Sequence, residues 1–365
     1  MSGPGAGAAG ARRVGVEEEF LLVDPATGAA SPSAPGLVAA APGALEPELQ
    51  REQVETGSAP HRDADALLAD LRARRRRAAA AAARAGAQLV ALGTHPQRVR
   101  PRTTPGERYE RIVERFGALA AEQLTCGCHV HVEIGDREEG VGVLDRIGPW
   151  LPVLLALSAN SPFWRGEDTG YASWRSQVWG RWPSAGPAGP VGTAARHDEL
   201  RARLLATGVL LDEGMVYADA RLSAAHPTVE VRVADVCLRA EDAALLARLV
   251  RALVERAAAD ARAGLPVPDD PPQLLRLTSW RAARDGVDGQ LVSPATGRPA
   301  PAAAVVAELV EHVRGPLAGA GDLDAVRAGT AAVLARGSGA RWQRQTARGA
   351  GLAGLVRAAA EVTLA

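Results

Sequence analysis

The sequence predicts an α+β protein whose strands form a sheet with an apolar back and a polar front. The first observation behind this prediction is the segment Thr125–Glu133, in which apolar and polar side chains alternate as in a half-buried β-strand. The second is a set of long segments rich in Ala, Leu and Arg, which are strong helix formers. The third is the composition of the 365 residues: 47% are hydrophobic and 23% are charged, as in a globular protein that can bury a sizeable core.

The N-terminal part of the chain is predicted to alternate strands with helices. Asp24-Pro25 is a turn signal that ends the first strand, and Gly86 is a stop signal for the first long helix. Pro149 and Pro152 interrupt an apolar helix, which is therefore too short to span a membrane. In chain order the expected elements are strands at Val14–Val23 and Glu48–Thr56, a helix at Asp63–Ala85, a strand at Gln88–Leu92, a helix at Glu107–Ala121, the strand at Thr125–Glu133 and a helix at Val141–Leu157.

A long segment without clear periodicity, Ser158–Val191, follows and is rich in Gly, Pro and Trp. Loops of this length are usually functional or disordered, and the aromatic content argues against disorder. Its residues Arg165, Arg175 and Arg181 either close over a substrate or lie in a loop packed by its own aromatic side chains. Beyond it we expect a helix at Ala195–Ala206, strands at Met215–Leu222 and Thr228–Asp235 joined by a turn at His226-Pro227, a helix at Glu241–Ala263, and two or three Ala/Leu-rich helices in the C-terminal third. At the other end of the chain, the Gly/Ala-rich residues 1–12 are expected to form a flexible tail.

Charge and residue usage exclude several classes of protein. The 42 basic and 42 acidic residues balance, so no global field points to nucleic acid or to an anionic membrane. No Lys occurs, which excludes a Schiff-base lysine and a P-loop lysine and leaves Arg, backbone amides or a metal to bind phosphate. The three cysteines provide neither a disulfide framework nor a four-cysteine zinc site. With no apolar signal core and no run of about twenty apolar residues, we expect a cytoplasmic protein.

The polar faces of the predicted strands are rich in Glu and His. Any one of these strands could simply be half-exposed. Carboxylates on adjacent strands repel one another unless cations pair with them, however, and a set of Glu with His suits Mg²⁺ or Mn²⁺ better than Zn²⁺. Glu18 falls on the opposite, apolar face. Alternation groups the polar-face residues as Glu17 with Glu19, Gln53 with Glu55, His129 with His131 and Glu133, Tyr217 with Asp219 and Arg221, and Glu230 with Arg232.

Metals at a carboxylate-lined face either activate water or neutralise and orient phosphates. Arg221 and Arg232 on this face would suit an anionic substrate, and an interstrand ion pair is the alternative for each. For the run Arg74–Arg77 in the first long helix we expect a solvated face and not a nucleic-acid site, because Asp residues precede it and the net charge is zero.

Six short motifs occur in order between Val14 and Arg348: Gly15-Val-Glu-Glu-Glu-Phe20, Gly93-Thr-His-Pro96, Cys126-Gly-Cys-His-Val-His-Val132, Ala159-Asn-Ser-Pro-Phe163, Glu230-Val-Arg232 and Trp280-Arg-Ala-Ala-Arg-Asp-Gly286. In this combination they resemble the carboxylate–amine ligase family related to glutamate–cysteine ligase, in its type 2 bacterial branch. The ordered set is more specific than any one motif. The resemblance implies a glutamine-synthetase-like catalytic fold, with a curved, mainly antiparallel sheet backed by helices, and a single catalytic domain at residues 13–365.

The resemblance also implies an ATP-dependent ligase that uses Mg²⁺ (or Mn²⁺). ATP phosphorylates a substrate carboxylate, and an amine then attacks the acyl phosphate to form an amide. In glutamate–cysteine ligases the carboxylate is the γ-carboxylate of glutamate and the amine belongs to cysteine. The family's residues carry over onto this sequence as the metal ligands Glu17, Glu19, Glu55, His129 and Glu230, with Arg232 beside the phosphates and His131 as a further catalytic candidate. Arg284, on a predicted helix, and Arg344, after a flexible Gly-Ser-Gly segment, could contact ATP phosphates or be surface arginines.

Two other functions remain open from the sequence. A metal-dependent hydrolase could use the same ligands without nucleotide, and a non-catalytic nucleotide or amino-acid binding protein could keep the fold without turnover. We expect small-molecule amino-acid and amine substrates and no nucleic-acid or membrane partner, and the sequence leaves a homodimer open. Strand residues do not decide which amino acid and which amine are used, because loops set that choice.

Overall fold

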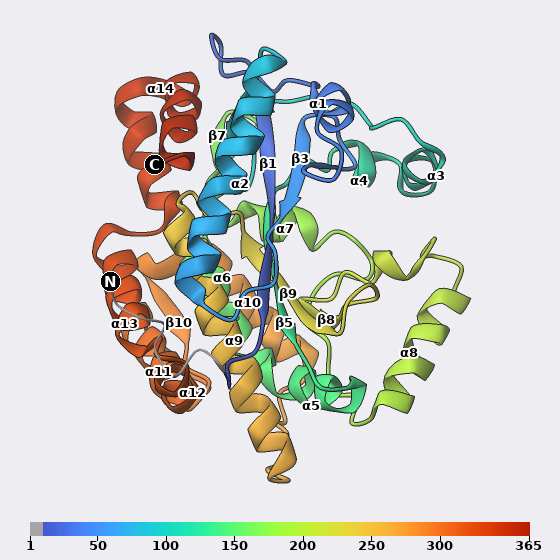
Figure 1. The fold of residues 1–365 in the computed structure, drawn as a ribbon, viewed down its shortest axis with the longest axis vertical. Helices are drawn as coiled ribbons and strands as arrows, with labels where there is room; N and C mark the ends of the chain where they lie inside the picture. Colours follow the sequence, from blue (N-terminus) through green and yellow to red (C-terminus); the bar gives the residue numbers. More distant parts are fainter. Residues whose placement is uncertain (1–9) are drawn as a thin grey trace.

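A seven-stranded sheet flanked by helices forms the centre of the computed structural model, which describes residues 10–365 (Figure 1). The strand order is β2-β3-β1-β5-β9-β8, with β4 also beside β1, and each neighbouring pair is antiparallel. The predicted α+β class with an antiparallel sheet is therefore confirmed. The strands of this sheet are β1 (Val14–Val23), β2 (Glu46–Pro47), β3 (Gln53–Gly57), β4 (Gln88–Val90), β5 (Gly127–Glu133), β8 (Ala220–Leu222) and β9 (Thr228–Asp235).

Helices cover the apolar face of the sheet. Because side chains alternate along a strand, β1 and β5 turn one set of side chains to the same side, where they are buried in one core with residues of α2, α9, α5 (Arg137–Ile147) and α6 (Leu151–Ser158). The strand residues in this core are Val14, Val16, Cys128, Val130 and Val132. Figure 1 shows α2 and α9 on the left of the strands, with α11 to α14 further out on the same side. The bounds are α2 (Ala64–Arg84), α9 (Ala240–Arg262), α11 (Ala302–His312), α12 (Arg314–Ala320), α13 (Leu323–Arg336) and α14 (Gly339–Thr363).

One ion pair is buried within this apolar layer. Glu18 of β1 and Arg75 of α2 are each 1% exposed and share two hydrogen bonds, of 3.0 and 2.5 Å. The other three N–H groups of the Arg75 guanidinium donate to backbone carbonyls at 2.7–3.1 Å. The expectation that the run Arg74–Arg77 is a solvated helix face is therefore wrong for Arg75, which turns inward to neutralise the one carboxylate that β1 presents to its apolar side.

Two predicted helices are broken in the structure. Gly117, at φ 53°, adopts a left-handed conformation that ends the first of them. Pro149 lies in a single 3-10 turn that interrupts the second. The expected helix at Glu107–Ala121 is α3 (Glu107–Phe116) and α4 (Ala118–Ala121), and the one at Val141–Leu157 is α5 (Arg137–Ile147) and α6 (Leu151–Ser158). The stretch Arg137–Ser158 has the length and apolar composition of a membrane span, but 67% of its most apolar window is buried inside the protein, as in a core helix.

Other element boundaries also differ from the predictions. The expected strand at Glu48–Thr56 begins only at Gln53, and of Met215–Leu222 only the last three residues pair as β8, after a 3-10 turn at Glu213–Met215. The segment Ser158–Val191 contains a short hairpin, β6 (Phe163–Trp164) and β7 (Glu167–Asp168), and helix α7 (Trp174–Trp179). The C-terminal third holds α10 (Pro272–Asp285) and α11 to α14, more than the two or three helices expected, together with the hairpin β10 (Gln290–Val292) and β11 (Pro299–Pro301). The remaining helices are α1 (Ala34–Ala40) and α8 (Ala194–Ala206).

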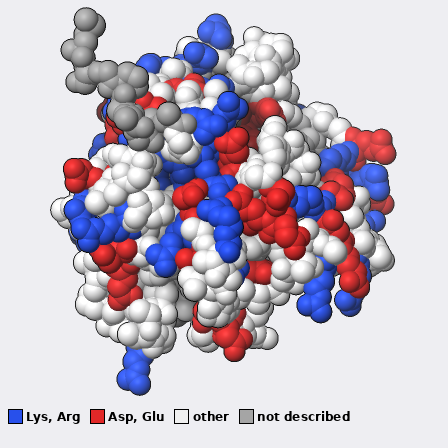
Figure 2. Space-filling view, turned by 60° about the horizontal axis from the view of Figure 1, so that its bottom comes forward, with Lys and Arg blue, Asp and Glu red and all other residues white. Residues whose placement is uncertain are grey.

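The start of the described chain is tied to two helices. Arg12 forms ion pairs with Glu139 of α5 at 2.7 Å and with Glu255 of α9 at 2.5 Å. Residues 1–9 of the expected flexible tail lie outside the described residues. Over the face drawn in Figure 2, acidic and basic side chains are interspersed, as the balanced composition suggests.

Candidate active site

Cross-strand register gathers the Glu and His side chains of four strands into one row on the polar face of the sheet. Because the strands are antiparallel and adjacent, residues from distant parts of the chain stand directly opposite one another. We call Glu17, Glu19, Glu55, His129, His131 and Glu230 the Glu/His row. The register pairs that build it are Glu19 with Glu55, Glu17 with His129, and His131 with Glu230, and Arg221 of β8 stands opposite Glu230 at its end.

The two imidazoles stand among the carboxylates of the row. His129 Nδ1 lies 3.4 Å from a Glu17 oxygen and His129 Nε2 lies 3.7 Å from a Glu19 oxygen. His131 Nε2 lies 3.2 Å from the other Glu17 oxygen, while its Nδ1 is 3.1 Å from the Thr228 hydroxyl. Neither His129 Nε2 nor His131 Nε2 has a properly oriented hydrogen-bond partner among the described residues, although both atoms are buried. Buried imidazole nitrogens that have no hydrogen-bond partner and lie beside carboxylates are suited to coordinate a cation.

A β-bulge in β9 places Arg232 against the row. Register shifts between Cys128 and Val130, which leaves β9 with one extra residue opposite His129. Arg232 forms an ion pair with Glu230, and its Nη1 lies 3.5 Å from His129 Nδ1. Arg221 also binds Glu230, at 2.7 Å. Burial opposes ionisation of Glu230, but Arg232, His129 and Arg221 outweigh it and lower the pKa of Glu230 to about 2.

Glu48 joins the row from an irregular segment between β2 and β3, and sequence reasoning missed it. One oxygen from each of Glu19, Glu48 and Glu55 lies within 4.8 Å of the others. Burial and the nearby charge of Glu19 raise the pKa of Glu48 to about 8. Burial and the charges of Glu48, Glu17 and Glu19 raise the pKa of Glu55 well above its usual value. The predicted strand Glu48–Thr56 included Glu48, but alternation put it on the face opposite Gln53 and Glu55; it reaches the row because the chain is irregular before β3 begins at Gln53.

The donor atoms fit a hard divalent cation. Two further groups meet the same 4.8 Å limit, Glu17 with Glu55 and His129, and Glu17 with His131 and Glu230. Carboxylate oxygens with some imidazole are the ligands that Mg²⁺ and Mn²⁺ accept, and a cation would offset the burial and the repulsion that raise the pKa of Glu48 and Glu55. The row borders a cavity of about 460 Å³, lined among others by Glu17, His131, Glu133, Arg13 and Arg74. Space for a ligand is therefore present beside the ligand set.

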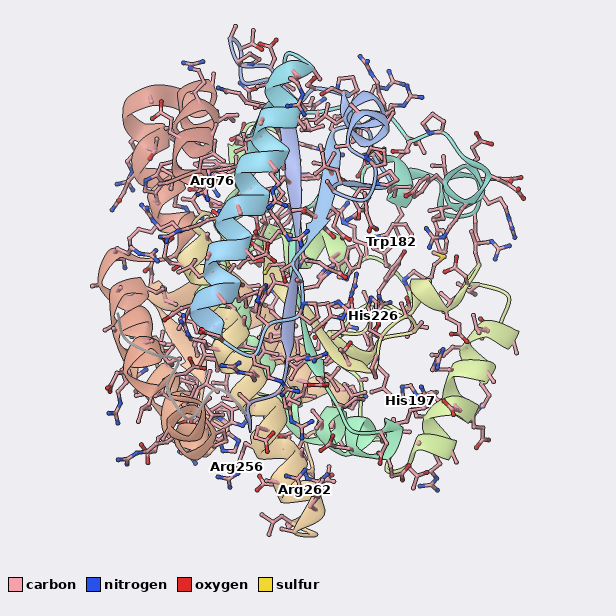
Figure 3. The ribbon with its side chains drawn as sticks, in the orientation of Figure 1. Arg76, Trp182, His197, His226, Arg256 and Arg262 are labelled. Carbon is pink, nitrogen blue, oxygen red and sulfur yellow. The ribbon has the colours of Figure 1, made fainter. Side chains whose placement is uncertain are left out.

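Aromatic side chains wall the polar face on the side away from α2. Trp179, Trp182 and Tyr217 pack on one another, with ring centres 4.7–6.5 Å apart. Figure 3 shows Trp182 and His226 on this side of the strands, and the His226 ring lies 6.3 Å from that of His131. Aromatic packing of the segment Ser158–Val191, one of the two alternatives for it, is therefore present, and Tyr217 from outside the segment takes part in it. Of its arginines, Arg165 and Arg181 bind Glu122 at the surface, at 2.7 and 3.3 Å, whereas Arg175 is 2% exposed.

Arg284 and Arg344 lie together in a different place. Arg344 binds both oxygens of Asp168, at 2.8 and 2.7 Å, and donates to the Tyr171 carbonyl. The Arg284 guanidinium stacks 5.5 Å from the centre of the Tyr171 ring. Both arginines line a surface depression whose lining includes no member of the Glu/His row. Arg344 uses its Nε and Nη2 for these bonds, which leaves the two Nη1 donors for another partner.

Comparison with known proteins identifies the family. The model of glutamate–cysteine ligase family 2 (GCS2) matches residues 13–358. A protein of Streptomyces avermitilis, provisionally named glutamate–cysteine ligase 2-1, is 50% identical over 340 residues, covering 92% of this chain and 94% of its own. A similarly named protein of Frankia alni is 50% identical over 353 residues, covering 92% of each chain.

Two solved structures share the fold at low sequence identity. Glutamate–cysteine ligase of Francisella tularensis, in complex with AMP, superposes with a TM-score of 0.67 at 14% identity, covering 97% of this chain and 89% of that one. A bifunctional glutathione synthetase of Pasteurella multocida gives a TM-score of 0.70 at 14% identity, covering 97% of this chain and 53% of that one. Sequence and fold agree: the chain belongs to glutamate–cysteine ligase family 2.

Proposed function

We propose that this protein is an ATP-dependent carboxylate–amine ligase that joins glutamate, through its γ-carboxylate, to the amine of cysteine. The observation that carries the proposal is the Glu/His row, in which carboxylates crowd around two imidazoles with unpartnered nitrogens, beside a cavity. Membership of the family supports the reaction class. The AMP bound by the Francisella tularensis enzyme supports a nucleotide as co-substrate. A cytoplasmic location, where ATP and free amino acids are available, is part of the proposal.

The reaction has two steps. The γ-phosphoryl group of ATP passes to a carboxylate oxygen, which releases ADP and leaves an acyl phosphate. The amine nitrogen then attacks the carbonyl carbon, the bond from that carbon to the phosphate oxygen breaks, and the nitrogen loses a proton as the amide forms. Negative charge moves between oxygens in both steps, so the protein contributes chiefly by holding the reactants in place and by neutralising charge.

The polar face supplies both contributions. Glu17 with Glu55 and His129, and Glu19 with Glu48 and Glu55, would hold Mg²⁺. When bound, the cation neutralises and orients the phosphates of ATP. Arg232 adds a fixed positive charge whose Nε has no partner among the described residues. Because the chain has no Lys, arginines carry all of the permanent positive charge available to the phosphates.

The direct test is product formation. Purified protein is incubated with ATP, Mg²⁺, glutamate and cysteine, and ADP and γ-glutamylcysteine are measured together; we expect both in equal amounts. ADP and an amide formed with a different pair from a panel of amino acids and amines would change the substrates and keep the ligase. No nucleotide-dependent amide with any pair, or turnover of esters or amides without nucleotide, would refute it.

A further inference from the structure

Arg75 and Arg175 are the most deeply buried arginines among residues 10–365, and they are held very differently. Arg75 makes five hydrogen bonds, two of them to the Glu18 carboxylate. Arg175 of α7 is 2% exposed, yet no carboxylate among the described residues lies within 4.0 Å of its guanidinium, and its Nε has no partner. Its Nη1 and Nη2 reach only the backbone carbonyls of Val233 and Arg232, at 3.5 and 3.4 Å. A buried cation with so little pairing is costly unless a ligand supplies the missing negative charge.

The guanidinium of Arg175 is directed at the Glu/His row. A Cβ atom placed on Gly127 would lie 2.2 Å from Arg175 Nη2 and 3.1 Å from His129 Nε2, so both nitrogens converge on the same glycine. The Gly127 N–H donates to a Glu19 oxygen at 2.6 Å, which ties this glycine to the row as well. A glycine inside a strand often marks the close approach of another group, and here that group is a cation.

Arg175 and Arg232 share one aromatic neighbour. The Cζ atoms of both side chains lie 5.8 Å from the centre of the Trp179 ring. Arg232 has Glu230 as its counterion, but each of the two guanidinium groups keeps an unpartnered, buried Nε–H. The charge of Asp235 acts on Arg175, but no Asp235 oxygen lies within 4.0 Å of the guanidinium, and those oxygens accept hydrogen bonds at 2.6–2.8 Å from two Ser hydroxyls and the Asn160 N–H. Each of the two guanidinium groups therefore keeps a buried N–H donor that no described side chain accepts.

We propose that Arg175 and Arg232, packed on Trp179, form an oxyanion site that binds a carboxylate or phosphate group of a substrate. The planar set of N–H donors of a guanidinium matches the geometry of a carboxylate or phosphate. An oxyanion bound here would accept the hydrogen bonds that these two arginines leave unmade. The role in catalysis rests on the proposed ligase function, whereas the binding of an oxyanion does not. The group that binds there is either the carboxylate of the amino acid or a phosphate of ATP.

The test compares Arg175→Met with Arg181→Met, a matched variant in the same segment whose guanidinium pairs with Glu122 at the surface. Binding of three probes is measured by calorimetry: inorganic phosphate, glutamate, and a non-hydrolysable ATP analogue with Mg²⁺. We expect Arg175→Met to lose about 10- to 100-fold in affinity for phosphate, the loss typical of a charged hydrogen-bond partner. Its affinity for glutamate or for the ATP analogue should fall by the same factor, depending on which of the two carries the oxyanion that binds at this site. Arg181→Met should bind all three probes like the wild type.

Stability separates this role from a structural one. Without ligand, Arg175→Met should melt no lower than the wild type, because the change removes an unpaired buried cation. If Arg175→Met fails to fold, two milder variants replace it. Arg175→Lys removes the planar guanidinium and Gly127→Ala fills the space beside it, and both are expected to bind the same probes with lower affinity. Phosphate binding that depends on Arg175 in a protein without ligase activity would keep the oxyanion site and refute only the proposed function. Unchanged affinity of Arg175→Met for all three probes, or no binding of any probe by the wild type, would overturn the inference.

Discussion

Replacing Arg75 by Met should destabilise this protein strongly, although Arg75 belongs to a run of four arginines on one helix. Arg75 joins the back of the sheet to the chain around Cys237 and to the end of α14, through its five hydrogen bonds to Glu18 and to three backbone carbonyls. The variant would leave the Glu18 carboxylate 1% exposed and without a cation. Glu18 lies between Glu17 and Glu19, so the same contact helps to hold the strand that carries two members of the Glu/His row.

The magnitude follows from the geometry. Removing one partner of a buried ion pair costs about 3–5 kcal/mol, because the other charge stays buried and unpaired. That is a large part of the roughly 5–15 kcal/mol that stabilises a typical folded protein. Arg76 is the adjacent residue on α2 and is exposed (labelled in Figure 3), so Arg76→Met should change stability by no more than about 0.5 kcal/mol. In Glu18→Gln/Arg75→Met no charge remains buried, and the double variant should recover part of the loss.

Urea unfolding, followed by circular dichroism at neutral pH, measures all of these terms. The wild type, the two single variants at Glu18 and Arg75, and the double variant form a cycle whose coupling energy we expect to reach about 2 kcal/mol. Arg75→Lys provides a milder variant if Arg75→Met is too unstable to purify. A loss below about 1 kcal/mol for Arg75→Met, or single losses that simply add, would refute the reasoning, since either result means that the pair is not coupled.

Three further predictions concern the row and the chain start. Glu17→Gln/Glu19→Gln should fold but lose the Mg²⁺-dependent stabilisation by ATP, worth about 2.7 kcal/mol at one hundred times Kd, and unchanged thermal shifts would contradict the metal assignment. In EDTA, Glu48→Gln should gain stability over the wild type as pH rises from 4.5 to about 8, because Glu48 of the wild type then ionises in the unfolded chain but stays protonated in the folded one; a gain that is the same at all pH values in urea unfolding would exclude this. Arg12→Met should cost about 1.5–3 kcal/mol near neutral pH. Arg12, helped by the Gly135 N–H and Arg262, lowers the pKa of Glu139 from 4.5 to about 2, so this cost should shrink as pH falls through that range, and an equal cost at about pH 6 and about pH 3 would count against the pair.

Local pattern predicted the strands that carry most of the site. The bounds of β1 and β9 agree with the sequence prediction, and α2 and α9 agree to within one residue at each end. Alternation also placed His129 and His131 opposite the buried Cys128, Val130 and Val132. These features depend only on the extended or helical geometry of a few consecutive residues, which the order of apolar and polar side chains reveals.

The sequence by itself thus determined the two-faced strands, the long helices and a face rich in Glu and His. The tertiary structure decided which of these side chains meet. The strand order and the bulge bring Arg232 to His129, and the irregular chain before β3 brings Glu48 to the row. Arg75 and Arg175 are both buried, but only Arg75 pairs with a carboxylate. Arg75 and Glu18 are 57 residues apart, and Arg175 and Val233 are 58 apart. Such contacts arise from burial and charge pairing between distant segments, and one arginine within a run differs from its neighbours only once the chain has folded around it.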